Sequence, residues 1–175
     1  MSGFGTSADA LRRNLPPAAE LRDLRLEIDE FNAAYAYVID EGNLEEWPNF
    51  FTEDGLYRIT ARENADANLP LGLIYCDGRG MMVDRVRATL KTTTHEPRYL
   101  RHFCSNVRIL GAEPDGRIQA RSNYMVTETL MEGDTKIFQS GRYEDTFIRR
   151  DGLLLKARHC VYDTLTITNA LLYPV

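Results

Sequence analysis

The chain has 175 residues, 43% of them hydrophobic, so it can bury one sizeable core and is too short to suggest two. Its formal net charge of -5 and its lack of a Lys/Arg block exclude the basic footprint of a nucleic-acid-binding protein. No apolar run approaches the roughly 20 residues of a membrane-spanning helix, and residues 1–15 lack the pattern of a secretory signal, so we expect a cytoplasmic protein that binds no membrane.

The first residues differ in composition from the rest of the chain. Residues 1–19 are small and polar and include Pro16-Pro17, which predicts an N-terminal arm that orders only against another surface. Residues 20–175 are expected to form a single domain, because no internal repeat or low-complexity segment divides them.

The domain is expected to begin with helices. Apolar residues recur every three to four positions from Glu20 to about Asp40, which predicts an amphipathic helix. The sequence Glu41-Gly42-Asn43 should end this helix. We expect Asn43 to cap a short second helix that turns Trp47 inward.

A strand, a loop and a helix are predicted next. Residues 55–62 alternate, with Tyr57 on one face and Arg58 on the other, as in a half-buried strand. Residues 63–80 are rich in Asn, Asp, Pro and Gly, which indicates a loop. Apolar spacing then predicts a helix over 81–91.

The second half is dominated by long predicted strands. Thr, Tyr, Val and Ile are frequent there, and turn signals such as Asp151-Gly152 separate four segments. These segments are residues 99–110, 117–131, 136–149 and 153–166. Strands of this length must twist, so we expect an α+β fold in which a curved antiparallel or mixed sheet wraps the N-terminal helices.

Several ordered motifs run through the chain. The first half contains Phe31-Asn32-Ala33-Ala34-Tyr35 through Asp40, Leu44-Glu45-Glu46-Trp47 and Phe50-Phe51-Thr52-Glu53-Asp54-Gly55-Leu56-Tyr57. The later part contains Leu73-Ile74-Tyr75-Cys76-Asp77, Met81, Asp84-Arg85-Val86, Arg101-His102, Ser105-Asn106-Val107, Gly141-Arg142-Tyr143-Glu144-Asp145 and Arg149. In order and spacing, over about residues 20–166, these motifs resemble the small (β) subunits of Rieske-type aromatic-ring-hydroxylating dioxygenases.

The resemblance implies a cone-like domain of the nuclear transport factor 2-like, cystatin-like class. It also implies assembly with other β subunits and with catalytic α subunits, commonly as α3β3. The α subunit of that family holds a Rieske [2Fe-2S] cluster and a mononuclear Fe(II), and receives electrons from a reductase or ferredoxin. The β subunit of that family is mostly structural. The resemblance is loosely closest to subunits that handle anthranilate, benzoate or salicylate, but it names neither the aromatic substrate nor the number of oxygen atoms inserted.

The residues of the chain itself predict no metal or cofactor site. The three cysteines lack the neighbouring histidine of a Rieske ligand set, and their odd number and wide spacing suit reduced thiols. His102, His159 and Asp163 could form an iron-binding triad only if the fold happened to bring these scattered residues together, which is a rare coincidence. We therefore expect iron only in the α partner.

Two alternatives remain open: a stand-alone lyase or isomerase of the dehydratase type, and a ligand-binding module with the same fold. The enzyme would use a pocket histidine and carboxylate, for which His102, Asp40 and Tyr35 are the candidates. By strand alternation His102 shares a face with Cys104 and Asn106, so it need not face the core.

Subunit contacts are expected where arginine and tyrosine gather, because both residue types are favoured at interfaces. The candidates are Arg85, Arg98, Tyr99, Arg101, Arg108 and Tyr143. The apolar residues after the last predicted strand, 165–175, are also expected to lie near an interface.

Overall fold

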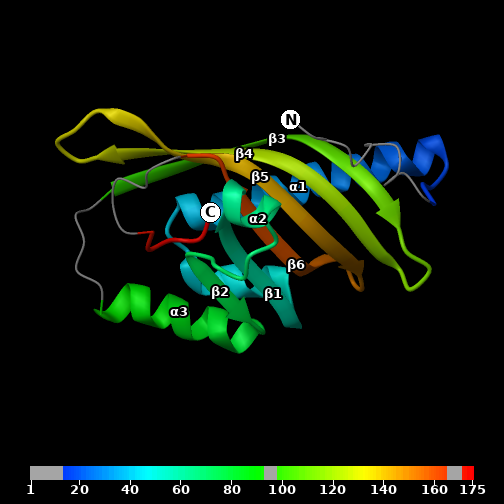
Figure 1. Cartoon of the computed structure of the whole chain (residues 1–175), viewed down its shortest axis with the longest axis horizontal. Helices are drawn as coiled ribbons and strands as arrows, with labels where there is room; N and C mark the ends of the chain where they lie inside the picture. The colour runs from blue at the N-terminus through cyan, green and yellow to red at the C-terminus, as the bar shows by residue number, and fades with distance from the viewer. Residues whose placement is uncertain (1–13, 93–97, 165–170) are drawn as a thin grey trace.

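The computed structural model describes residues 14–92, 98–164 and 171–175, and in these a layer of helices lies against one curved sheet (Figure 1). The helices are α1 (Ala18–Asp40), the 3-10 helix η1 (Leu44–Phe50), α2 (Arg62–Asp66) and α3 (Arg79–Thr92). The strands are β1 (Phe51–Ala61), β2 (Ile74–Asp77), β3 (Arg98–Ala112), β4 (Arg117–Leu130), β5 (Thr135–Arg149) and β6 (Leu153–Tyr162). Most of the predicted N-terminal arm, residues 1–13, lies outside the described residues.

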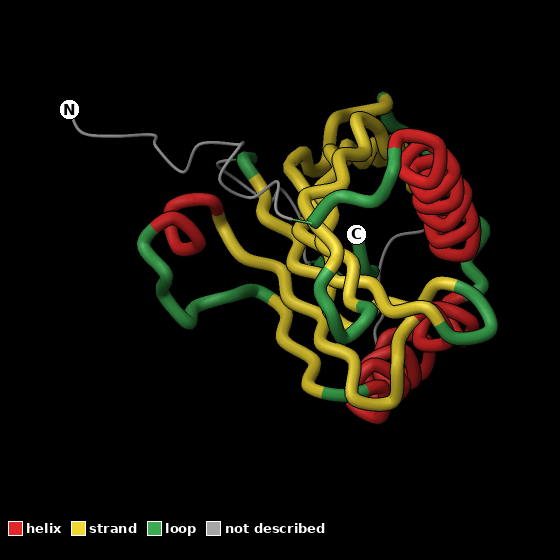
Figure 2. The backbone as a smooth tube through the Cα atoms, turned by 90° about the vertical axis from the view of Figure 1, so that its right-hand side faces the viewer, coloured by secondary structure: helices red, strands yellow, loops and turns green. Residues whose placement is uncertain are grey.

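The sheet has the strand order β2-β1-β6-β5-β4-β3. β1 runs parallel to β6, whereas all other neighbours in it are antiparallel, so the sheet is mixed. β3, β4 and β5 have 15, 14 and 15 residues, and the twist accumulated over such lengths curls the sheet around the helical layer (Figure 2). The predicted α+β architecture is confirmed.

The first helix follows the predicted pattern. Leu24, Ile28 and Ile39 are among its buried residues, at spacings that keep them on one face. The helix ends at Asp40. Two residues later Gly42 has a φ of 77°, and the N–H of Asn43 donates to the Val38 carbonyl at 2.9 Å. This is the left-handed termination that glycine favours.

Two local predictions were wrong. The second helix is a 3-10 helix, and within the described residues the Asn43 side chain makes no capping hydrogen bond. Pro48 lies inside that helix and has no N–H to donate, so a regular α-helical ladder cannot form. The stretch 63–80, predicted as a loop, contains part of α2 and the whole of β2, whose four residues are too few to show a periodic pattern.

An irregularity in β3 reverses which residues face α1. Asn106 has a φ of 58°, and the register with β4 shifts between Ser105 and Arg108. Such a bulge moves the following residues to the opposite face. His102 therefore faces inward before the bulge and Val107 faces inward after it, so the simple alternation that grouped His102 with Asn106 was wrong.

The core contains a cluster of aromatic rings near the start of β1. Trp47 makes edge-to-face contacts with Phe51 and Tyr57, at centroid distances of 5.6 and 4.9 Å. All three side chains are fully buried. Edge-to-face rings contribute stability beyond the area they bury, so this cluster anchors η1 on β1.

Candidate functional site

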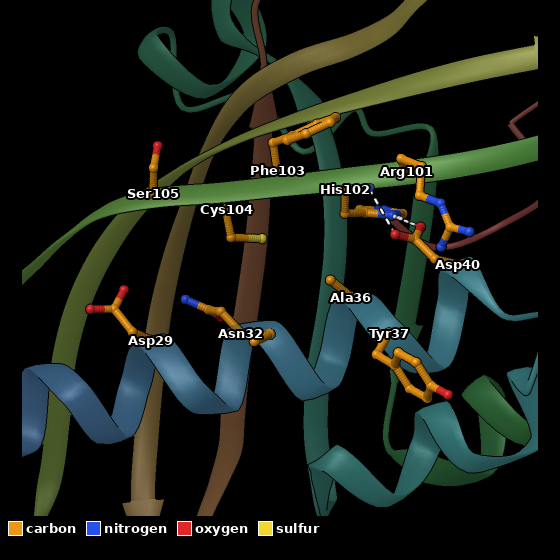
Figure 3. Close-up of a pocket in the computed structure, with 11 residues that line it drawn as sticks. Asp29, Asn32, Ala36, Tyr37, Asp40, Arg101, His102, Phe103, Cys104 and Ser105 are labelled. Carbon is orange, nitrogen blue, oxygen red and sulfur yellow. Dashed lines mark hydrogen bonds and ion pairs between the residues drawn. The ribbon is translucent and has the colours of Figure 1, made fainter.

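A groove of about 620 Å³ lies between α1 and the edge strand β3 (Figure 3). Its residues from α1 are Asp29, Asn32, Ala33, Ala36, Tyr37 and Asp40. Its residues from β3 are Arg101, His102, Phe103, Cys104 and Ser105. Tyr37 is 64% exposed and Phe103 is 54% exposed, so two accessible aromatic rings flank a polar interior.

The groove brings together two of the three candidate catalytic residues, His102 and Asp40. The His102 Nδ1 atom lies 2.6 Å from Asp40 Oδ1, and the His102 backbone N–H donates to Asp40 Oδ2 at 2.9 Å (Figure 3). A carboxylate only accepts hydrogen bonds, so this geometry assigns a proton to Nδ1. Asp40 is the last residue of α1 and therefore fastens the end of that helix to β3 with both oxygens.

The third candidate, Tyr35, lies elsewhere. It is fully buried, accepts a hydrogen bond from Trp47 Nε1 at 2.9 Å and donates to the Val175 carbonyl at 3.2 Å. Burial raises the pKa of Tyr35 above its usual range, so the phenol stays protonated. The structure thus joins His102 with Asp40 but commits Tyr35 to another part of the cone.

Behind the groove a buried arginine organises the interior of the cone. Arg158 donates from Nε and Nη2 to the two carboxylate oxygens of Asp145, at 2.9 and 2.8 Å, and from Nη2 to Asn32 Oδ1 at 2.6 Å. Its guanidinium carbon lies 4.2 Å from the Tyr35 ring centroid and 4.1 Å from that of Tyr143. Charge pairing and stacking on both faces together stabilise this buried cation.

Tyr143 was expected at a subunit interface, and this prediction was wrong. Its side chain is fully buried, stacked on Tyr124 at a centroid distance of 4.5 Å and covered by Arg158. Tyr143, Asp145 and Phe147 alternate toward the interior along β5, so Tyr143 cannot contact a partner while the fold is intact.

The other interface candidates fall into two groups. Tyr99 and Arg101 are exposed on β3, and Arg101 pairs with Glu41 at 2.8 Å on the surface. The rest are at least partly buried within the chain. Arg98 pairs with Glu128, Arg85 Nη2 donates to the Leu171 carbonyl, and Arg108 is partly buried. The exposed subset is therefore confined to the first half of β3.

A second polar cluster lies on the opposite face of the sheet from α1. Arg58 Nη2 donates to His159 Nδ1 at 2.9 Å, and Glu144 Oε2 lies 3.7 Å from the same nitrogen. Burial, followed by the Arg58 charge, lowers the pKa of His159 to about 4. His159 is therefore neutral near pH 7 and accepts the arginine hydrogen bond.

The metal-ligand candidates do not converge. Within residues 14–92, 98–164 and 171–175, no group of three or more His, Cys, Asp or Glu side chains is arranged to hold a metal ion. His102 and His159 belong to the two separate clusters described above, and Asp163 pairs with Arg62 at 2.7 Å. Over the same ranges, no helix is long and apolar enough to cross a membrane.

Comparison with known proteins identifies the family. The sequence profile described as "Ring hydroxylating beta subunit" matches residues 34–169. The chain belongs to the ring-hydroxylating dioxygenase β-subunit family. It is 38% identical to the anthranilate 1,2-dioxygenase small subunit of Burkholderia cepacia, over 85% of this chain and 92% of that one. It is 35% identical to a terephthalate 1,2-dioxygenase terminal oxygenase β subunit (beta 2) of Comamonas sp., over 84% and 95% of the two chains.

A solved structure agrees with this assignment. A protein of Novosphingobium aromaticivorans DSM 12444, described as the β subunit of an aromatic-ring-hydroxylating dioxygenase, superposes with a TM-score of 0.80 and 39% identity, over 88% of this chain and 98% of that one. The cone is thus the expected nuclear transport factor 2-like fold. The β subunit forms part of a multisubunit oxidoreductase, and the stand-alone lyase or isomerase reading is not favoured.

Sequence reasoning missed the residues that organise the interior of this β subunit. Arg158 and Asp145 are directly opposite each other in the β5–β6 register. Opposite charges at inward positions of adjacent strands would have pointed to them, had the register been known. Asn32, which lies on α1 in the motif Phe31-Asn32-Ala33-Ala34-Tyr35, accepts a hydrogen bond from Arg158.

Proposed function

We propose that this β subunit is a structural component of an α3β3 terminal oxygenase. In that assembly the α chains would hold the Rieske [2Fe-2S] cluster and the mononuclear Fe(II), and a reductase or ferredoxin would supply electrons to them. The β subunit would position neighbouring α chains so that their iron centres meet in a fixed geometry.

One observation carries the proposed structural role: the side chains that could have done chemistry are used to hold the fold together. Both carboxylate oxygens of Asp40 accept hydrogen bonds, one from the ring and one from the backbone of His102, and the Tyr35 hydroxyl donates to the Val175 carbonyl. Both oxygens of Asp40 are therefore used to hold β3 against α1. His102 Nε2 has no hydrogen-bond partner among the described residues, but it is buried, whereas a general base must be accessible to a substrate.

The substrate class is proposed from the relatives. Two of them carry the names of anthranilate and terephthalate dioxygenases, and both compounds are aromatic carboxylates. We therefore propose that the complete oxygenase acts on an aromatic carboxylate bound in the α chain. We also propose a cytoplasmic location, which is supported by three unpaired cysteines in the described part of the chain.

The exposed part of β3 is the proposed subunit contact. Tyr99 is 60% exposed and Phe103 is 54% exposed, and the Arg101 side chain lies between them on the same edge strand. Large aromatic residues beside an arginine are the side chains that dominate binding energy at protein interfaces. An edge strand bearing them is best covered by another subunit.

Co-expression with its catalytic α chain, followed by native mass spectrometry, tests the assembly. We expect a particle with the mass of three α and three β chains. The double variant Tyr99→Ala, Phe103→Ala should shift the particle toward free chains, while Leu26→Ala, an exposed apolar residue on α1, should not. Chains that stay separate would contradict the α3β3 proposal, and full assembly of the double variant would contradict the β3 contact alone.

A further inference from the structure

The end of the described chain returns to the inside of the cone. Val175 is fully buried and Pro174 is also buried. Figure 2 shows the C end of the trace enclosed between the curved sheet and the helices. The expectation that this apolar segment lies at an interface was therefore wrong for Pro174 and Val175, which are buried against their own chain, whereas residues 171–173 are half-buried.

Val175 is held by several polar groups that converge on its backbone. Its carbonyl oxygen accepts hydrogen bonds from the hydroxyls of Tyr35 and Tyr57, each at 3.2 Å, and lies 3.6 Å from Cys160 Sγ. Its N–H donates to the Tyr57 hydroxyl at 2.9 Å. Trp47 Nε1 donates to the Tyr35 hydroxyl at 2.9 Å, which leaves the Tyr35 proton directed at Val175.

The two phenols form a built carbonyl-binding site. Both are fully buried, and burial raises the pKa of Tyr35 and Tyr57 above the usual range, so both remain hydrogen-bond donors at any ordinary pH. Trp47 and Phe51 pack against Tyr57, and the Arg158 guanidinium lies 4.2 Å from the Tyr35 ring centroid, so the surroundings are mostly apolar with one buried cation. Two donors aimed at one oxygen within mostly apolar walls is the general design of a small-molecule site.

The segment is fastened from outside this site by α3. Arg85 Nη2 donates to the Leu171 carbonyl at 3.0 Å, and Thr89 Oγ1 donates to the Leu172 carbonyl at 3.4 Å. These contacts can be removed without altering the phenols, so release of the segment and binding at the site can be tested separately.

We propose that the interior of the cone is a binding site for the carbonyl or carboxylate group of a small apolar molecule, and that the chain occupies this site with its own residues 171–175. The proposal does not depend on the oxygenase assembly. A tethered occupant acts at an effective concentration in the millimolar range, so a free ligand competes poorly until the tether is loosened.

The test uses the full chain with the double variant Arg85→Ala, Thr89→Ala. Arg87→Ala is the matched control, because Arg87 lies on the same helix, is exposed and pairs only with Asp84 in the described structure. Hydrogen exchange of residues 171–175, read by mass spectrometry, reports release of the segment. Isovalerate is the probe, because it is valine without its amino group. Trp47 is the only tryptophan, so its fluorescence reports the site.

We expect faster exchange of residues 171–175 and a saturable Trp47 response to isovalerate in the double variant, with neither in the wild type or in Arg87→Ala. Adding Tyr57→Phe should weaken probe binding by about tenfold, the effect of losing one hydrogen bond. Val175→Arg, which would place an unpaired charge at a fully buried position, is a second way to release the segment. An unchanged exchange rate in both release variants, or a released segment without a Tyr57-dependent probe response, would overturn the proposal.

Discussion

Arg158 and Asp145 form a two-point ion pair in the centre of the cone, with side chains that are 0% and 1% exposed. Burial opposes the charge on Arg158, but the adjacent Asp145 carboxylate outweighs it and raises the pKa of Arg158 well above its usual range. Burial raises the pKa of Asp145 above its ordinary value, against the opposing charge of Arg158. The two-point geometry, in which both carboxylate oxygens accept from the guanidinium, is that of an ionised pair, and it links β5 and β6 to Asn32 on α1.

Arg158→Met should be strongly destabilising, because it leaves Asp145 as an uncompensated buried charge. We expect the free energy of unfolding to fall by about 3–5 kcal/mol, measured by urea denaturation. Arg149→Ala is the control: it removes an exposed ion pair with Glu27 and should cost about 1 kcal/mol or less. Equal losses in the two variants would show that the buried pair has no special role.

Asp40→Ala should separate a structural from a catalytic role of the α1–β3 groove. Two groups of His102 lose their acceptor, so stability should fall by roughly 1–3 kcal/mol. Asp29→Ala, an exposed carboxylate lining the same groove, should change it little. Turnover by the assembled oxygenase should survive in both variants at a temperature where both are folded. Loss of turnover in Asp40→Ala alone would indicate that the Asp40–His102 pair takes part in catalysis.

Stability should depend on pH through His159. The pKa of His159 is about 4 in the folded chain, below its ordinary value of 6.5, so only the unfolded chain gains a proton as the pH falls through that interval. Stability is therefore complete above pH 6.5, declines toward pH 4 and changes no further through this group below it. The total for this group is about 2 kcal/mol, allowing for partial exposure.

His159→Gln removes the titration while keeping an oxygen that can accept from Arg58. As the pH falls from 7.5 to 4.5, the free energy of unfolding of the wild type should fall more steeply than that of the variant, so that the variant gains about 2 kcal/mol relative to the wild type. Parallel curves would mean that His159 does not contribute to the acid sensitivity.

Gly141 allows β5 to approach β6 closely. A Cβ at this position would collide with the Val161 carbonyl oxygen and lie 2.8 Å from Tyr162 Cα, and both are backbone atoms that cannot move alone. Gly141→Ala should therefore lower the melting temperature substantially, by the equivalent of about 3 kcal/mol. Gly152→Ala, where an added Cβ meets no described atom within 4 Å, should be nearly neutral. Similar melting temperatures for both variants would contradict the close approach.

The sequence predicted the elements better than their connections. Periodicity located α1, and the four long strands were predicted to within a few residues over the described ranges, because local patterns encode helices and strands. The parallel pairing of β1 with β6 was not predicted, since pairing depends on contacts more than 90 residues apart, such as Tyr57 with Arg158.

The candidate site was predicted only in part. The pairing of His102 with Asp40 was anticipated, but the bulge at Asn106 was not, because a single residue in the left-handed region leaves no periodic trace. The burial of Arg158 and Val175 was also missed. Both depend on partners from distant segments, which only the folded chain brings together.

The central claim is that this β subunit supports chemistry performed elsewhere. The most direct measurement is iron content and oxygen consumption with anthranilate and terephthalate, for the chain purified alone and for the chain co-purified with its α partner and supplied with the reductase. We predict no iron and no turnover for the chain alone, and iron with turnover for the complex. Stoichiometric iron or aromatic turnover in the isolated chain would contradict the account.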